Sequence, residues 1–201
     1  MATSLPPLPK PVTARGEATR RRLLNAAEGE FGARGYHGAS VNSITRRAEV
    51  AQGTFYLYFR SKEELFLTLV RDIGHQLRAH CAQAIAKAAN RLEAERLGLE
   101  AFLQFATRHR SLYRIVQESQ FVDPAVFREY YEKLAEGYTA ALERAARNGE
   151  LARGDAATRA WALMGVGHFL GMRWSLWQKQ MPPPEVLDEV MGLIARGMGP
   201  R

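Results

Sequence analysis

Residues 40–65, SVNSITRRAEVAQGTFYLYFRSKEEL, hold the most informative pattern in this chain of 201 residues. Ser40 is a good N-cap for a helix that reaches about Ala48, with Val41 and Ile44 on the same face at helical spacing. Residues 49–51 form a turn, in which Val50 is the apolar residue between two helices. The pattern predicts two short helices joined by a tight turn.

The second helix is expected over about residues 52–59. Phe55 and Phe59 lie four residues apart, so both can be buried against the first helix. Other side chains then face outward or sideways: Gln52, Gly53, Thr54, Tyr56, Leu57 and Tyr58. Ser61 and Glu64 form a capping box, which predicts that a long helix begins at Lys62. The free amides at its start, together with the Lys62 ammonium, suit a phosphate group.

This segment resembles the DNA-binding domain of the TetR (tetracycline-repressor) family of bacterial regulators. The resemblance covers roughly residues 19–66 and is carried by Thr19, Ala26, Ala27, Phe31, Gly35, Tyr36, Ser40, Val41, Ile44, Ala48, Val50, Gly53, Thr54, Phe55, Tyr56, Tyr58, Phe59, Lys62 and Leu65. A run this long at fixed spacing is a specific signal. One departure is Glu49, where the family often has glycine. In a left-handed conformation, glutamate there costs about 1 kcal/mol relative to glycine.

The expected fold is all-α, with nine helices, three in a head and six in a body, and no strand. Residues 1–17 are interpreted as a flexible basic, proline-rich arm, residues 18–62 as the helix-turn-helix domain, and residues 63–201 as an effector-binding and dimerisation domain. The other helices are expected over about residues 18–34, 62–85, 94–107, 111–119, 124–148, 155–178 and 184–196.

The charge distribution agrees with a DNA-binding head. Residues 1–60 hold 9 Lys and Arg against 4 Asp and Glu, a net of +5, whereas residues 61–201 hold 19 against 17, a net of +2. Phosphate binding requires such an excess, although a solvated basic surface is the alternative. One cysteine, Cys81, excludes an intramolecular disulfide and fits a reducing cytoplasm. The most apolar run, residues 161–172, is too short to span a bilayer, so we expect a soluble, cytoplasmic protein that associates with the nucleoid through DNA.

The resemblance assigns roles to residues of the head. Thr54, Tyr56 and Leu57 are expected nearest the base edges, and Gly53 allows the backbone to come close. The expected phosphate contacts are Ser40, Asn42, Gln52, Tyr58 and Lys62. For Tyr56 and Tyr58, packing within the head is the alternative. The arginines at 15, 20, 21 and 22 either reach DNA or form solvated surface.

The helix expected over residues 155–178 is apolar around most of its circumference, so it must be buried on several sides. Gly167 and Gly171 lie one turn apart and would admit a second helix closely, with Trp174 beside them. The resemblance implies a homodimer through the last two helices, which reads an inverted-repeat operator in double-stranded DNA.

Candidates to line an effector cavity in the body are Phe105, Tyr113, Tyr138, Trp161, Met164 and His168, although such residues are more often simple core. Arg114, with Arg108 and Arg110, suggests an anionic small-molecule effector such as a coenzyme A thioester. Surface charge is the alternative. The predicted function is therefore a ligand-responsive repressor released from its operator by an effector. An effector-independent or architectural DNA-binding protein is the second hypothesis.

An enzyme is not expected. His75, His80 and Cys81 lack the i and i+4 spacing that would place two ligands, or a nucleophile and its base, on one helix face. The sequence contains no glycine-rich phosphate loop and no nucleophile elbow. We therefore expect no catalytic residue, no metal and no cofactor.

Overall fold

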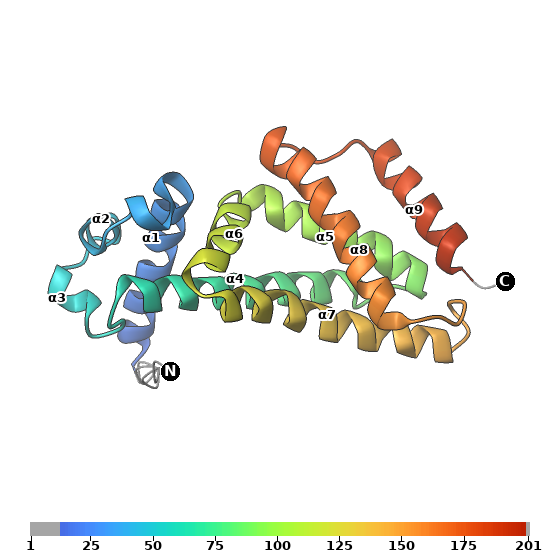
Figure 1. The fold of residues 1–201 in the computed structure, drawn as a ribbon, viewed down its shortest axis with the longest axis horizontal. Coiled ribbons are helices and arrows are strands. Elements are labelled where there is room, and N and C mark those ends of the chain that lie inside the picture. The colour runs from blue at the N-terminus through green and yellow to red at the C-terminus, as the bar shows by residue number, and fades with distance from the viewer. Residues whose placement is uncertain (1–12, 200–201) are drawn as a thin grey trace. The chain divides into compact units, whose positions relative to one another are not determined.

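The computed structural model describes residues 13–199, which form nine α-helices and one short π-helical segment without a strand (Figure 1). The all-α prediction is confirmed over these residues. The chain divides into two compact units, one of residues up to Asp72 with Arg114–Phe127, the other of Ile73–Tyr113 with residues from Arg128 onward. No helix in the described part of the chain is long and apolar enough to cross a membrane.

The first unit begins with α1 (Ala14–Gly38), four residues earlier than the sequence predicts. The reason is Thr13, whose side chain accepts a hydrogen bond from the Gly16 amide at 3.1 Å and so caps the helix. The expected arm over residues 1–17 therefore loses its last residues to α1, while residues 1–12 lie outside the described part. Gly35, where the helix was expected to end, interrupts α1 with φ 74° and ψ 172°.

After α1 come α2 (Val41–Arg47), α3 (Gln52–Phe55) and the start of α4 (Lys62–Ile85). Part of α6 (Leu112–Val122) completes this unit. α1 packs on α2, and α2 packs on α3. The core contains the predicted Phe55 and Phe59, together with Leu23, Leu24, Ala27, Phe31, Ile44, Leu65, Phe66 and Leu69.

The α-helical part of α3 ends at Phe55, four residues before the end that the sequence predicts. Beyond it, the amides of Leu57 and Tyr58 donate to the carbonyls of Thr54 and Phe55, at 3.2 and 2.9 Å. Bonds of this three-residue spacing form a tighter turn than an α-helix. Phe59 remains buried because the amide of Phe59 still bonds to the Phe55 carbonyl at 3.0 Å.

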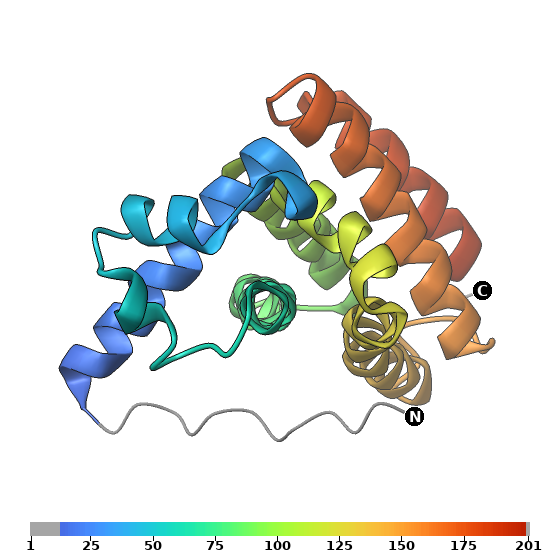
Figure 2. The same ribbon diagram turned by 60° about the vertical axis from the view of Figure 1, so that its left-hand side comes forward.

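The second unit contains the rest of α4, α5 (Arg91–Arg108), most of α7 (Pro124–Arg147), α8 (Ala156–Gly171), the π-helical η1 (Met172–Trp177) and α9 (Pro184–Met198). α5 packs against α8, η1 and α9, and α8 and α9 run side by side (Figures 1 and 2). A core between α7, α8 and α9 is formed by Leu142, Ala145, Leu151, Ala160, Ile194 and Met198.

Local signals explain most ends of these helices. Asn90 caps α5 by accepting from the Glu93 amide at 2.9 Å, so that helix begins three residues before the predicted start. Pro124 opens α7 and Asp155 caps α8, as the sequence predicts. The helix expected over residues 155–178 instead becomes π-helical at Met172. There Ser175 Oγ donates to the Leu103 carbonyl at 3.2 Å, which ties η1 to α5.

Candidate nucleic-acid interface and helical body

Backbone hydrogen bonds close the turn between α2 and α3, and one residue of this turn, Glu49, has a strained conformation. Glu49 has φ 55°, the left-handed conformation considered in the sequence analysis. Ser40 Oγ accepts from the Ser43 amide at 3.0 Å, and Ser43 Oγ accepts from the Ser40 amide at 3.1 Å. This reciprocal cap fixes the start of α2, and serine at the third helical position takes the part that Glu or Gln usually plays.

The surface formed by α3 and the turn that follows it is open to solvent. Tyr56 is 52% exposed and Leu57 73% exposed, although the neighbouring Phe55 is completely buried. Ser40, Asn42, Gln52 and Gly53 are also exposed, while Thr54 and Tyr58 are half-buried. A Cβ built on Gly53 would have no described atom within 4 Å, apart from its two chain neighbours and the backbone of its own helix. Of the three proposed base-reading residues, Tyr56 and Leu57 are thus exposed and Thr54 is half-buried.

Several arginines of the head are exposed. Arg15, Arg22, Arg46 and Arg60 are exposed. Arg21 instead pairs with Asp72 at 2.6 Å, and the Arg20 guanidinium lies 5.5 Å from the centre of the Phe59 ring. Arg46 and Arg60 were missed as candidate phosphate contacts, although both stand within the segment that carries the resemblance.

Lys62 has partners within the head. Its ammonium donates to the carbonyls of Tyr36 at 2.7 Å and Ala39 at 3.0 Å, and lies 4.4 Å from the centre of the Tyr36 ring. An ammonium has three N–H donors, so one is left for a phosphate. The phosphate role of Lys62 stays a prediction, beside a structural role that the sequence did not indicate.

In the body, Tyr113 and His168 lie together. The Tyr113 hydroxyl donates to the His168 carbonyl at 3.0 Å, and their rings are 5.2 Å apart. Tyr131 approaches the same histidine ring, at 6.5 Å. Burial raises the pKa of Tyr113 and lowers the pKa of His168, which favours the neutral form of both side chains.

The other proposed effector residues are spread over several places. Phe105 is buried and stacks on His109 with ring centres 4.3 Å apart. Met164 is half-buried. Tyr138 donates to Glu95, whose carboxylate also accepts from Arg91 at 2.7 Å, and burial raises the pKa of Tyr138 well above its ordinary value.

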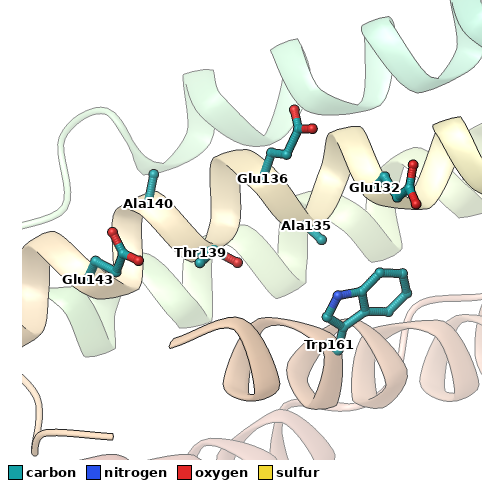
Figure 3. Close-up of a pocket in the computed structure, with 7 residues that line it drawn as sticks. All are labelled: Glu132, Ala135, Glu136, Thr139, Ala140, Glu143 and Trp161. Atoms are coloured by element: carbon teal, nitrogen blue, oxygen red, sulfur yellow. The ribbon is translucent and has the colours of Figure 1, made fainter. Parts of the chain in front are cut away.

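Trp161 is half-exposed and lies in an open groove of about 470 Å³ between α7 and α8 (Figure 3). The α7 side of this groove carries three carboxylates in addition to small side chains: Glu132, Glu136 and Glu143, with Ala135, Thr139 and Ala140. Carboxylates repel phosphate and thioester head groups of like charge. The groove at Trp161 therefore does not suit the anionic effector that the sequence suggested.

Arg114 is grouped with the first unit, whereas Tyr113 and the other effector candidates are grouped with the second. Its guanidinium donates to the carbonyls of Gly32 and Ala33 and pairs with Glu118 at 2.9 Å. Arg108 and Arg110 are exposed in the second unit. The Arg114 guanidinium thus has partners within the first unit, and a role of the three arginines in anion binding stays a prediction.

The residues expected at a dimer interface face their own subunit. Gly167 approaches Leu99 and Phe102 of α5, and Gly171 approaches Phe102 and Tyr113, while Trp174 is buried. Small residues at these positions admit side chains of the same chain, and the expected role of Gly167, Gly171 and Trp174 toward a partner stays a prediction. The exposed apolar side chains of α8, η1 and α9 are instead Trp161, Val166, Phe169, Trp177 and Leu193.

Comparison with known proteins agrees with this geometry. The model of the family "Bacterial regulatory proteins, tetR family" matches residues 23–69. The chain is 31% identical over 195 residues to the HTH-type transcriptional regulator YdgC of Bacillus subtilis, covering 94% of this chain and 96% of that protein. It is 33% identical over 103 residues to the HTH-type transcriptional activator FasR of Mycolicibacterium smegmatis, covering 51% of this chain and 47% of that protein.

Among solved structures, the fold is similar to the transcriptional regulator FadR from Bacillus subtilis in complex with stearoyl-CoA. The TM-score is 0.76 at 20% identity, covering 88% of this chain and 98% of that one. The family model and the near full-length similarity to YdgC agree with the helix-turn-helix described above. This chain belongs to the TetR family of helix-turn-helix transcriptional regulators.

Proposed function

We propose that this regulator is a ligand-responsive repressor that binds an inverted-repeat operator as a dimer and is released by a small-molecule effector. The observation that carries the DNA-binding part is the exposure of Tyr56 and Leu57 directly beside the buried Phe55. Two adjacent exposed side chains, held in place by the buried Phe55, offer a contact surface to a partner. The major groove of DNA supplies one.

The proposed contacts divide into base readout and phosphate binding. Leu57 makes apolar contacts, for example with a thymine methyl group, and the Thr54 hydroxyl bonds base edges. Phosphates are held by Ser40, Asn42, Gln52, Tyr58 and Lys62, to which the exposed Arg46 and Arg60 are now added. Gly53 has open space above its Cα, so the DNA backbone can approach it closely.

Dimerisation is proposed through the exposed apolar face of α8, η1 and α9. Phe169 is 70% exposed, Trp177 66% and Leu193 60%, which is unusual for a lone soluble surface. A two-fold dimer pairs the same face of both subunits and would cover these side chains. Two heads held this way read half-sites about 34–36 Å apart.

The proposed effector is a hydrophobic anion of the acyl-coenzyme A type. Support comes from the fold shared with a FadR that was solved with stearoyl-CoA. Arg108 and Arg110 are exposed cations that lie between Phe105 and Tyr113 in the chain, and we add them to Arg114 as candidates for the anionic end. An effector that favours a dimer with wrongly spaced heads by about 1–3 kcal/mol weakens operator binding about 5–150-fold.

Footprinting on the promoter region beside its own gene, repeated with stearoyl-CoA, stearate and coenzyme A, tests the proposal. A repressor protects an inverted repeat, and the thioester alone removes the protection. Protection that no thioester changes would favour the second hypothesis, an effector-independent or architectural DNA-binding protein. If no site is protected, the proposed binding to an operator is wrong.

A further inference from the structure

The C-terminal end of α1 is broken at Gly35. Its φ of 74° and ψ of 172° lie in a region that glycine alone adopts without strain. The chain then continues through Tyr36 to Gly38, and the Ala39 amide bonds back to the Gly35 carbonyl at 3.2 Å. Ser40 follows and caps α2. The direction in which α2 leaves α1 therefore depends on how this break is held.

Two side chains of α6 satisfy the backbone groups that the break releases. In an unbroken helix, the Tyr36 amide would donate to the Gly32 carbonyl. Here the amide donates to Glu118 Oε2 at 2.5 Å, and Arg114 Nη1 donates to the carbonyls of Gly32 at 3.2 Å and Ala33 at 3.1 Å. Arg114 Nε also donates to Glu118 Oε1 at 2.9 Å. We call Arg114 and Glu118 the α6 clasp.

The clasp fits closely around Gly35. A Cβ at that position would lie 2.7 Å from both Arg114 Nη2 and Glu118 Oε1. From another direction, the Lys62 ammonium bonds the carbonyls of Tyr36 and Ala39. The short segment before α2 is thus fixed by the start of α4 and by α6. The Arg114–Glu118 ion pair is partly exposed and by itself contributes little to stability. The bonds of the clasp to the backbone around Gly35 instead fix the conformation of that segment.

We propose that Arg114 and Glu118 are positioning residues for DNA binding, which hold the end of α1 so that α2 and α3 face the operator together. The inference rests on the proposed DNA-binding role of that face. Arg114 follows Tyr113, which belongs to the other compact unit and bonds the His168 carbonyl there. The clasp therefore connects the head, through one peptide bond, to a residue that we propose for the effector site.

Operator affinity of Glu118 variants tests the clasp, with fluorescence anisotropy on the footprinted duplex. Glu118→Ala removes the acceptor of the Tyr36 amide and is expected to weaken binding about tenfold. Glu118→Gln keeps an amide oxygen for that N–H and should stay within about threefold of the wild type. Glu143→Ala is the matched control, since Glu143 forms an exposed i, i+4 pair with Arg147 on α7. Wild-type affinity in Glu118→Ala would overturn the proposal.

Hydrogen exchange of the amides at residues 36–39 gives a readout that needs no DNA and that a general loss of stability would not reproduce. In Glu118→Ala these amides are expected to exchange at least about tenfold faster, while amides of α8 and α9 keep their rates. Unchanged exchange at Tyr36, or equal acceleration throughout the chain, would overturn the clasp. Faster local exchange in a protein whose wild type binds no operator would contradict the proposed function and leave the clasp standing.

Discussion

A single backbone angle makes Glu49 an unusual residue in this head. Its φ of 55° is left-handed, and a side chain in that conformation costs about 1–2 kcal/mol relative to glycine. The larger conformational freedom of glycine in the unfolded chain offsets part of this difference. Glu49→Gly is therefore expected to raise the free energy of unfolding by about 0.5–1 kcal/mol, measured by urea denaturation.

Glu49→Ala serves as the control for this prediction. Alanine removes the carboxylate but keeps the Cβ, so the left-handed strain persists and little stability should be gained. A gain as large in Glu49→Ala as in Glu49→Gly would assign the effect to charge and not to the backbone angle.

Base readout and phosphate binding are separable at the level of single residues. Leu57→Ala or Thr54→Ala should change the preference at particular base pairs by about 1–3 kcal/mol. Arg46→Ala and Lys62→Ala should instead weaken binding to all sequences and each reduce the salt slope by about 1. Binding titrations over operator variants at several salt concentrations measure both effects.

Each outcome can go against the assignment. A uniform loss over all variants after Leu57→Ala would exclude base readout at that position. If Lys62→Ala weakens the affinity but leaves the salt slope unchanged, Lys62 does not bind a phosphate. Its role is then structural, through its hydrogen bonds to the carbonyls of Tyr36 and Ala39.

At the scale of elements, a buried ion pair within α5 accepts a hydrogen bond from α7. Arg91 and Glu95 have side chains 10% and 3% exposed and are 2.6 Å apart, and Tyr138 of α7 donates to the same carboxylate. Removing one partner leaves a buried charge, which costs about 3–5 kcal/mol. We expect Glu95→Ala to lower the free energy of unfolding by about 3 kcal/mol, measured by denaturant titration. The exposed pair of Glu143 and Arg147 is the control, and Glu143→Ala should change it by less than about 1 kcal/mol.

The elements show which structural features were accessible from the sequence. Caps and breakers act within a few residues, so Ser40, Pro124 and Asp155 predicted helix starts correctly. Burial of Phe55 and Phe59 followed from their spacing. The sequence did not indicate which face of α8 meets α5, because a helix that is apolar all round has no periodic signal to orient it. Gly167 was therefore assigned to the partner.

Contacts between residues far apart in the chain could not be predicted from the sequence either. The bonds of Glu118 to Tyr36 and of Arg21 to Asp72 join residues 82 and 51 positions apart. Charged residues on exposed helix faces are common, and nothing in their spacing distinguishes these from solvated ones. The site residues proposed for DNA and effector accordingly remain predictions, whereas the helix-turn-helix and the family are established.

At the scale of the whole molecule, the two compact units are joined within helices. The three boundaries between them, after Asp72, Tyr113 and Phe127, fall inside α4, α6 and α7. Domain boundaries usually fall in flexible linkers with few contacts. From the sequence we placed the boundary of the head at residue 62. Residues 114–127 were not included in it, because their contribution to the first unit depends on contacts between residues far apart in the chain. Continuous helical backbone between the two units is consistent with the coupling of DNA binding to an effector that we propose.

Dimerisation is the property of the whole molecule that the exposed face of α8 predicts. Phe169→Glu would place a charge where a partner's apolar side chains are expected, and burying an unpaired charge is strongly unfavourable. Because Phe169 is 70% exposed within the subunit, the substitution should not unfold the chain. Light scattering at micromolar concentration is expected to give the dimer mass for the wild type and the monomer mass for the variant.

Phe121→Glu is the control, since Phe121 is 83% exposed but belongs to the first unit, and this variant should remain dimeric. A dimer in both variants would move the interface away from α8, and a monomeric wild type would contradict the dimer altogether.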